Sequence, residues 1–149
     1  MSVAALDKTD LKILSILQED SRKSYSDVAK KLGLSETAVR NRVGNLVKKG
    51  VIKKFSLVLD ADKIGRPVMA VIGIVGDIGP VASSRLVEFE EVTDAYTVTG
   101  DFNLIVKVLC RDIKHLDQTI EKMRSLGSAI ETRSHVVLKK VKEAGNIVL

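Results

Sequence analysis

The segment from Ser24 to Leu59 constrains this chain most, because two short helical patterns, a glycine turn between them and an apolar tail follow one another in 36 residues. Between Arg22 and Lys54 the chain carries ten lysines and arginines against two acidic residues, a local net charge of +8. A small helical unit with this charge is suited to a polyanion, and DNA is the expected partner.

Capping residues and apolar spacing predict two helices at the start of the chain. The first spans Asp7–Glu19, and Asp10 stands three residues after the capping aspartate. The second begins after Ser24, whose spacing to Asp27 fits a capping box, and it ends at Gly33. Both helices have an apolar face with which to form a small core.

The third predicted helix is capped by Ser35, runs to Lys49 and is ended by Gly50. On a helical wheel its apolar positions cluster on one face, which is expected to be buried. The opposite face is short and polar, as entry into a DNA groove requires. The apolar, β-branched stretch Val51–Leu59 that follows is predicted to form a strand or wing.

The third helix supplies most of the predicted DNA contacts, since the second helix of a helix-turn-helix enters the major groove. Thr37, Arg40 and Asn41 are expected near base edges, because Asn pairs with adenine and Arg with guanine. The full set of predicted DNA-binding residues is Ser35, Thr37, Arg40, Asn41, Arg42, Lys48, Lys53 and Lys54. Two alternatives stay open: a solvated helical face that contacts nothing, and for Arg42 an ion pair with an acid on the first helix.

Beyond Pro67 the net charge and the spacing of apolar residues both change. Residues 1–66 carry a net charge of +6 and residues 67–149 a net charge of −1, which favours two halves with different partners. The predicted elements of the second half are strands at Val68–Gly76, Ala95–Thr99, Leu104–Leu109 and Ala129–Val141, a helix at Val81–Phe89, and a helical stripe of Ile113, Leu116, Ile120 and Met123.

The order β-α-β, β-α-β is typical of a ferredoxin-like arrangement. We therefore predict an α+β chain with a winged helix-turn-helix DNA-binding domain over 1–59, a linker over 60–67 and a ferredoxin-like domain over 68–149. Cys110 is the only cysteine, which excludes an intrachain disulfide and fits a reducing compartment. No signal peptide, membrane span, metal site or cofactor motif is expected, so the predicted location is the cytoplasm.

Three groups of residues form one longer pattern: Leu6, Asp7, Asp10, Ile13 and Leu14; then Ser35, Val39, Arg42, Val43, Leu46, Gly50, Val51 and Ile52; then Leu59, Asp60 and Gly65. This pattern resembles that of the Lrp/AsnC (feast/famine) transcription regulators, over essentially the whole chain from 7 to 141. The resemblance implies a C-terminal αβ-sandwich (RAM) domain that dimerises through its sheets, higher assemblies such as octamers, and palindromic operators. It also implies a free amino acid as effector.

In that family the effector pocket centres on a Gly-Asp-aromatic-Asp hairpin, which here reads Gly100-Asp101-Phe102-Asn103. Asn103 stands where the family usually has an acid, and it offers hydrogen bonds but no charge. The resemblance gives these expected effector-binding residues: Thr99, Gly100, Asp101, Asn103, Thr132 and Ser134. The alternative is that Gly100 and Asp101 form an ordinary hairpin turn.

Two other functions are weighed against a regulator controlled by a small ligand. Some proteins that resemble this family are sirohaem decarboxylases that depend on His and Arg, but this chain has only His115 and His135, both expected to be structural or solvated. No catalytic triad, metal-ligand cluster or phosphate loop is recognisable. The third possibility is an architectural protein that wraps DNA and carries no effector.

Overall fold

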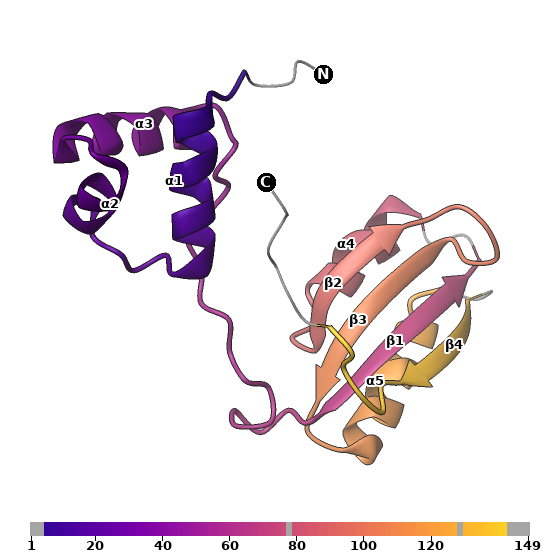
Figure 1. Ribbon diagram of the computed structural model, residues 1–149. Coiled ribbons are helices and arrows are strands. Elements are labelled where there is room, and N and C mark those ends of the chain that lie inside the picture. The colour runs from indigo at the N-terminus through magenta and orange to yellow at the C-terminus, as the bar shows by residue number, and fades with distance from the viewer. Residues whose placement is uncertain (1–4, 77–78, 128–129, 143–149) are drawn as a thin grey trace. The chain divides into compact units, whose positions relative to one another are not determined.

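A computed structural model describes residues 5–76, 79–127 and 130–142 (Figure 1). The chain divides into two compact units, one ending at Val58 and the other spanning Leu59–Lys142. Each has a hydrophobic core of its own.

The first unit contains three helices, α1 (Lys8–Glu19), α2 (Tyr25–Leu32) and α3 (Glu36–Lys48). Each begins after the residue predicted to cap it, because an Asp or Ser side-chain oxygen accepts a backbone N–H that the first turn leaves unpaired. Gly33 ends α2 with a φ of +67°, a conformation that favours glycine. The predictions of these three helices are confirmed. Their shared core contains Ile13, Ile16, Leu17, Val28, Ala29, Val39 and Val43.

The strand or wing predicted at Val51–Leu59 is wrong, because these residues form no strand. The N–H groups of Val51 and Ile52 both donate to the Leu46 carbonyl, at 2.9 and 3.2 Å, and so belong to the end of α3. Beyond them, the backbone of Lys53–Leu59 makes no hydrogen bond with any described residue. A strand needs a neighbouring strand with which to pair, and the described part of this unit contains helices and no strand.

The predicted linker, residues 60–67, forms a turn that packs on the second unit. Ala61 is buried, and the Arg66 N–H donates to the Ala61 carbonyl at 2.8 Å. The Arg66 guanidinium then reaches the Glu90 carbonyl at 2.9 Å. The chain is therefore held in place just before the first strand begins.

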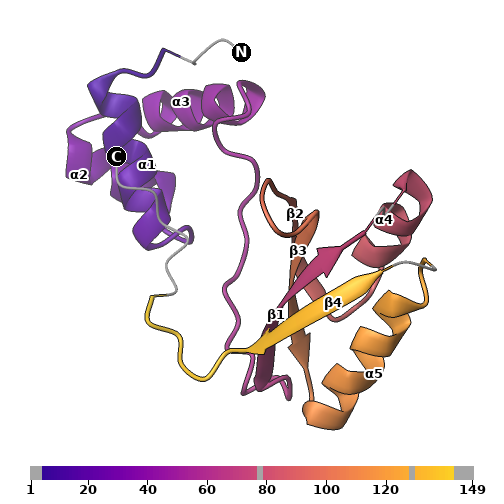
Figure 2. The same ribbon diagram turned by 90° about the vertical axis from the view of Figure 1, so that its right-hand side faces the viewer.

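The second unit is a four-stranded antiparallel sheet of β1 (Val68–Val75), β2 (Val92–Thr97), β3 (Leu104–Cys110) and β4 (Glu131–Val136). The strand order is β2-β3-β1-β4. Two helices, α4 (Pro80–Val87) and α5 (Ile113–Arg124), cover one face of the sheet, as Figure 2 shows. The ferredoxin-like prediction is confirmed, and this strand order is a feature that the sequence did not reveal.

The core of the second unit lies between the sheet and its helices. Its members include Ala70, Ile72, Ile74, Leu86, Val106, Val108, Leu116, Ile120 and Met123. Ile113 does not join them, because its side chain is 60% exposed in the first turn of α5. Thr119 is buried in the helix instead, and its hydroxyl donates to the His115 carbonyl at 2.8 Å.

The last strand is shorter than the predicted Ala129–Val141, and Ala129 lies outside the described residues. Since β4 runs antiparallel to β1, its last residue, Val136, lies opposite Ala70, and the Val137 N–H donates to the Met69 carbonyl at 2.8 Å just beyond it.

Candidate nucleic-acid interface

The helix α3 divides cleanly into a buried and an exposed face. Val39, Val43 and Leu46 are 0 to 2% exposed, which confirms the side of the helix predicted to face the core. Thr37, Arg40, Asn41 and Lys48 are all exposed on the rest of the helix. These four of the side chains predicted to meet DNA are thus gathered on one accessible surface of one helix.

Ser35 has a structural role at the start of α3, where its hydroxyl oxygen accepts the Ala38 N–H at 3.1 Å. Its O–H group remains available, since this bond uses only the acceptor side of the oxygen. Ser35 therefore combines a helix cap with a free hydroxyl donor at the end of the helix that was predicted to enter the DNA groove.

Arg42 is the exception among the predicted DNA contacts. Its Nη1 donates to Asp7 Oδ2 at 2.6 Å and to Asp10 Oδ1 at 2.7 Å, so the alternative of an ion pair with the first helix is confirmed. The same two aspartates form the capping box of α1. The Asp10 backbone N–H and the Arg42 guanidinium both hold the pKa of Asp7 below its usual value.

Arg40 has two neighbours that the DNA-contact prediction did not include. Its Nη2 donates to Glu36 Oε1 at 2.7 Å, and its Cζ lies 5.3 Å from the centre of the Tyr25 ring. The spacing of Glu36 and Arg40, one helical turn apart, was a signal in the sequence for their ion pair. The contact with Tyr25 joins α2 to α3, and no local pattern reveals it.

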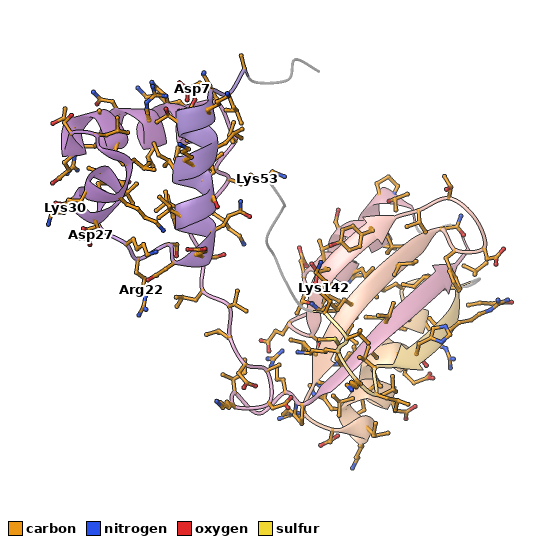
Figure 3. All side chains as sticks on the ribbon, in the orientation of Figure 1. Asp7, Arg22, Asp27, Lys30, Lys53 and Lys142 are labelled. Carbon is orange, nitrogen blue, oxygen red and sulfur yellow. The ribbon has the colours of Figure 1, made fainter. Side chains whose placement is uncertain are left out.

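The remaining basic side chains surround this unit. Figure 3 shows Arg22, Lys30 and Lys53 projecting outward from it. Lys53 and Lys54 are exposed, as predicted, but they stand on an extended segment without strand partners. Cations on such a chain suit contacts with phosphate groups, which need charge and little geometric precision.

The hairpin between β2 and β3 is tied to the end of β1 by Asn103. The Asn103 N–H donates to the Ile74 carbonyl at 2.9 Å, and its side-chain oxygen accepts the Gly76 N–H at 3.0 Å. Gly100 has a φ of +108°, which favours glycine, and Asp101 is exposed beside it. The amide oxygen of Asn103 is thus already engaged in an intramolecular hydrogen bond, at the position where the family usually has an acid.

Of the six predicted effector residues, Thr132 and Ser134 lie on the opposite face of the sheet from Phe102, the aromatic residue of the hairpin. Thr132 and Ser134 stand opposite Ile74 and Ile72 in the β1–β4 ladder, so they share the face that the helices cover. The Thr132 hydroxyl also accepts a hydrogen bond from Arg124 Nε of α5, at 2.8 Å. Phe102, by contrast, packs against Gly73, whose ladder partners belong to the opposite face.

Among the described residues, no helix covers that opposite face of the sheet (Figure 1). By register it presents half-buried apolar side chains from β1 and β3, namely Met69, Val71, Ile105 and Leu109. Polar groups are interleaved with them. Lys107 lies 3.4 Å from Asp94, and the hydrogen bond from Thr93 and the charge of Lys107 keep the pKa of Asp94 low despite its burial.

His115 is part of a buried contact inside the second unit. Its Nδ1 accepts a hydrogen bond from the Arg111 N–H at 3.2 Å. Its Nε2 is therefore the protonated nitrogen of the ring, and it donates a hydrogen bond to Glu91 Oε1, 2.7 Å away. Burial raises the pKa of Glu91, but hydrogen bonds from its own backbone and from His115 outweigh burial and lower it. Both ring nitrogens of His115 are thus used within the protein.

Comparison with known proteins agrees with this architecture. Residues 6–53 match a family described as winged helix-turn-helix DNA-binding, and residues 81–147 match the Lrp/AsnC ligand binding domain. The HTH-type transcriptional regulator LysM of Sulfurisphaera tokodaii is 34% identical over 137 residues, 92% of this chain and 98% of its own. The regulator FL11 of Pyrococcus abyssi is 31% identical over 93% of both chains.

The solved structure of an AsnC family transcriptional regulator from Agrobacterium tumefaciens has a TM-score of 0.86 at 30% identity and covers 96% of this chain and 97% of its own. A helix-turn-helix unit with an exposed polar helix, joined to a ferredoxin-like unit, defines a DNA-binding transcriptional regulator. The chain belongs to the Lrp/AsnC family. The relatives are named as regulators, which favours this function over an enzyme. Within the described residues, no helix is long and apolar enough to cross a membrane.

Proposed function

We propose that this regulator reads its operator with the exposed face of α3, through Thr37, Arg40 and Asn41. The observation that carries the proposal is the division of α3 into a fully buried apolar face and an exposed polar face. The core fixes the helix, and side chains held on a rigid helix can select hydrogen-bonding groups on base edges.

The surrounding cations anchor the phosphate backbone in this proposal. Ser35, Lys48, Lys53 and Lys54 have exposed side chains around the reading face. Arg42 is given a structural role in place of the predicted DNA contact, since its guanidinium holds Asp7 and Asp10 of the first helix. Phosphate contacts fix the position of the protein on DNA and contribute affinity that depends on salt.

We further propose that residues 1–59 form the DNA-binding domain, that residues 60–67 are the linker and that residues 68–149 mediate assembly. The helix-free face of the sheet, with Met69, Val71, Ile105 and Leu109, supports a homodimer, because a two-fold pair of such faces would cover the apolar side chains. An octamer built from dimers and a cytoplasmic location remain predictions of the same proposal.

A free amino acid is the proposed effector, bound at the Thr99–Asn103 hairpin. The positive φ of Gly100 and the exposed carboxylate of Asp101 support this site, and the match to the family's ligand-binding domain includes it. A regulator from Neisseria meningitidis was solved with L-Met, but at 21% identity it supports only the shared fold. Asn103 offers no charge to an α-amino group, so Asp101 carries that role alone.

The test is selection of bound DNA from a random pool by the full-length protein, with and without a mixture of amino acids. The expected result is a pair of short half-sites related by two-fold symmetry, with a yield that changes when the effector is present. Light scattering on the same samples gives the number of subunits. Extended protection of DNA without sequence preference would instead support the architectural alternative and contradict base reading by α3.

A further inference from the structure

Tyr25, Glu36 and Arg40 form a small cluster on the DNA-facing side of the first unit. Arg40 is held from two directions, by the Glu36 carboxylate at 2.7 Å and by the Tyr25 ring, whose centre lies 5.3 Å from Cζ. The residues come from two helices, with Tyr25 opening α2 and the other two one turn apart on α3. The guanidinium therefore has a defined position before any DNA arrives.

This arrangement leaves Arg40 able to bind a base. Its side chain is 61% exposed, and only one of its nitrogens donates to Glu36. A guanidinium has further N–H groups in the same plane, which suffice for the paired contact with guanine O6 and N7. Because the ring and the carboxylate restrict its rotamers already, less conformational freedom is lost on binding.

Glu36 places a negative charge at the end of α3 that is proposed to approach DNA. Its side chain is 49% exposed in the first turn of α3, the end of the helix nearest the bases, where phosphate groups repel a carboxylate. The ion pair with Arg40 reduces this repulsion and also makes Arg40 a poorer phosphate anchor. One group on base edges suits a carboxylate in this place, the N4 amino group of cytosine.

We infer that Tyr25, Glu36 and Arg40 act together as a reader of G·C base pairs in each half-site, with Arg40 on guanine, Glu36 on a cytosine amino group and Tyr25 as the positioning residue. This inference rests on the proposed function, because it requires α3 to lie in the major groove. It adds two residues, Tyr25 and Glu36, and a base identity to that proposal.

The experiment compares Tyr25→Leu with Tyr25→Phe in the full-length protein. Phenylalanine keeps the ring beneath Arg40, whereas leucine removes it. Tyr25 is half-buried, packs against the core of the first unit and borders an open hollow of about 330 Å³ beside Phe55, so thermal unfolding checks that both variants fold. Each protein then selects DNA from a random pool at several salt concentrations.

The wild type and Tyr25→Phe are expected to require guanine at one position of each half-site. Tyr25→Leu and Glu36→Ala are expected to relax that same position by about tenfold and to leave the other positions and the salt dependence unchanged. The inference is overturned if Tyr25→Leu selects the wild-type sequence or weakens all sequences equally. If the wild type selects no sequence at all, the proposed function fails with it.

Discussion

The Phe102 ring lies against the Cα of Gly73, on the face of the sheet that carries no helix. A Cβ added to residue 73 would stand 2.8 Å from Phe102 Cγ and closer still to two other ring atoms. The Arg133 guanidinium approaches the same ring, with its Cζ 5.9 Å from the ring centre. The hairpin proposed to bind an effector is thus in contact with the surface proposed to pair two subunits.

We expect Gly73→Ala to displace the Phe102 ring, because the new methyl group would occupy its space. Overpacking of this kind typically costs about 1 to 3 kcal/mol. Chemical denaturation should show the loss, and light scattering should show weaker self-association.

The matched control is the double variant Gly73→Ala with Phe102→Leu, in which the smaller side chain makes room for the methyl group. The double variant should be more stable than the sum of the two single effects predicts. Simple additivity of the two changes would show that the ring and Gly73 do not interact.

We expect the first unit to lose stability in acid through Asp7. Its pKa is lowered in the folded state, so its contribution is complete above the usual value of 3.8 and is lost as the pH falls through the lower folded value. The chain has no tryptophan and two tyrosines, so Tyr25 fluorescence in a Tyr96→Phe background reports on this unit alone.

The variant Asp7→Asn should be less stable than the parent at pH 7 and should show a smaller change with pH. Arg42→Gln should behave similarly, because it removes the shared donor of both aspartates. Wild-type acid sensitivity in both variants would assign the effect to other carboxyl groups.

We expect Asn41→Ala and Lys53→Ala to weaken DNA binding in different ways. Loss of a base contact at Asn41 should cost about 1 to 3 kcal/mol on the operator and relax the selected sequence. Loss of a phosphate contact at Lys53 should weaken all sequences and reduce the salt slope by about 1. Titrations of operator and random DNA at several salt concentrations distinguish the two, and equal effects of both variants on both DNAs would refute base reading by Asn41.

We expect Asp101→Ala to abolish the thermal stabilisation by any amino acid that binds the hairpin, because it removes the one carboxylate there. The melting temperature of the free protein should change little, since Asp101 is exposed. The control is Asn103→Asp, which retains an oxygen for the Gly76 N–H and should fold normally. If the amino acid still raises the melting temperature of Asp101→Ala as much as that of the wild type, the effector does not bind through Asp101 and the proposed site is wrong.

Features coded by neighbouring residues were predictable from the sequence. The three caps of the first unit, the buried face of α3 and the order of elements in the second unit all follow from local spacing and chemistry. The ion pair between Glu36 and Arg40 could also have been predicted, because the two residues are one helical turn apart.

Features that depend on contacts between residues far apart in the sequence could not be predicted from it. Val51–Leu59 has the composition of a strand, but whether it pairs depends on a neighbour that the stretch does not encode. Thr132 and Ser134 were expected beside the hairpin, yet the register of β4 against β1 places them on the other face from Phe102. The Tyr25 contact with Arg40 likewise joins residues from different helices.

The extended stretch Lys53–Leu59, which makes no backbone hydrogen bond with the described residues, bears on how such regulators diversify. Each unit has a core of its own: Thr37 and Asn41 are not among the core residues of the second unit, and no hairpin residue is among those of the first. If α3 reads the operator and the hairpin binds the effector, as proposed, a lineage can acquire a new operator while it keeps its old signal, or a new signal while it keeps its old operator. Exchange of whole halves between relatives is an equally accessible route to new regulatory circuits.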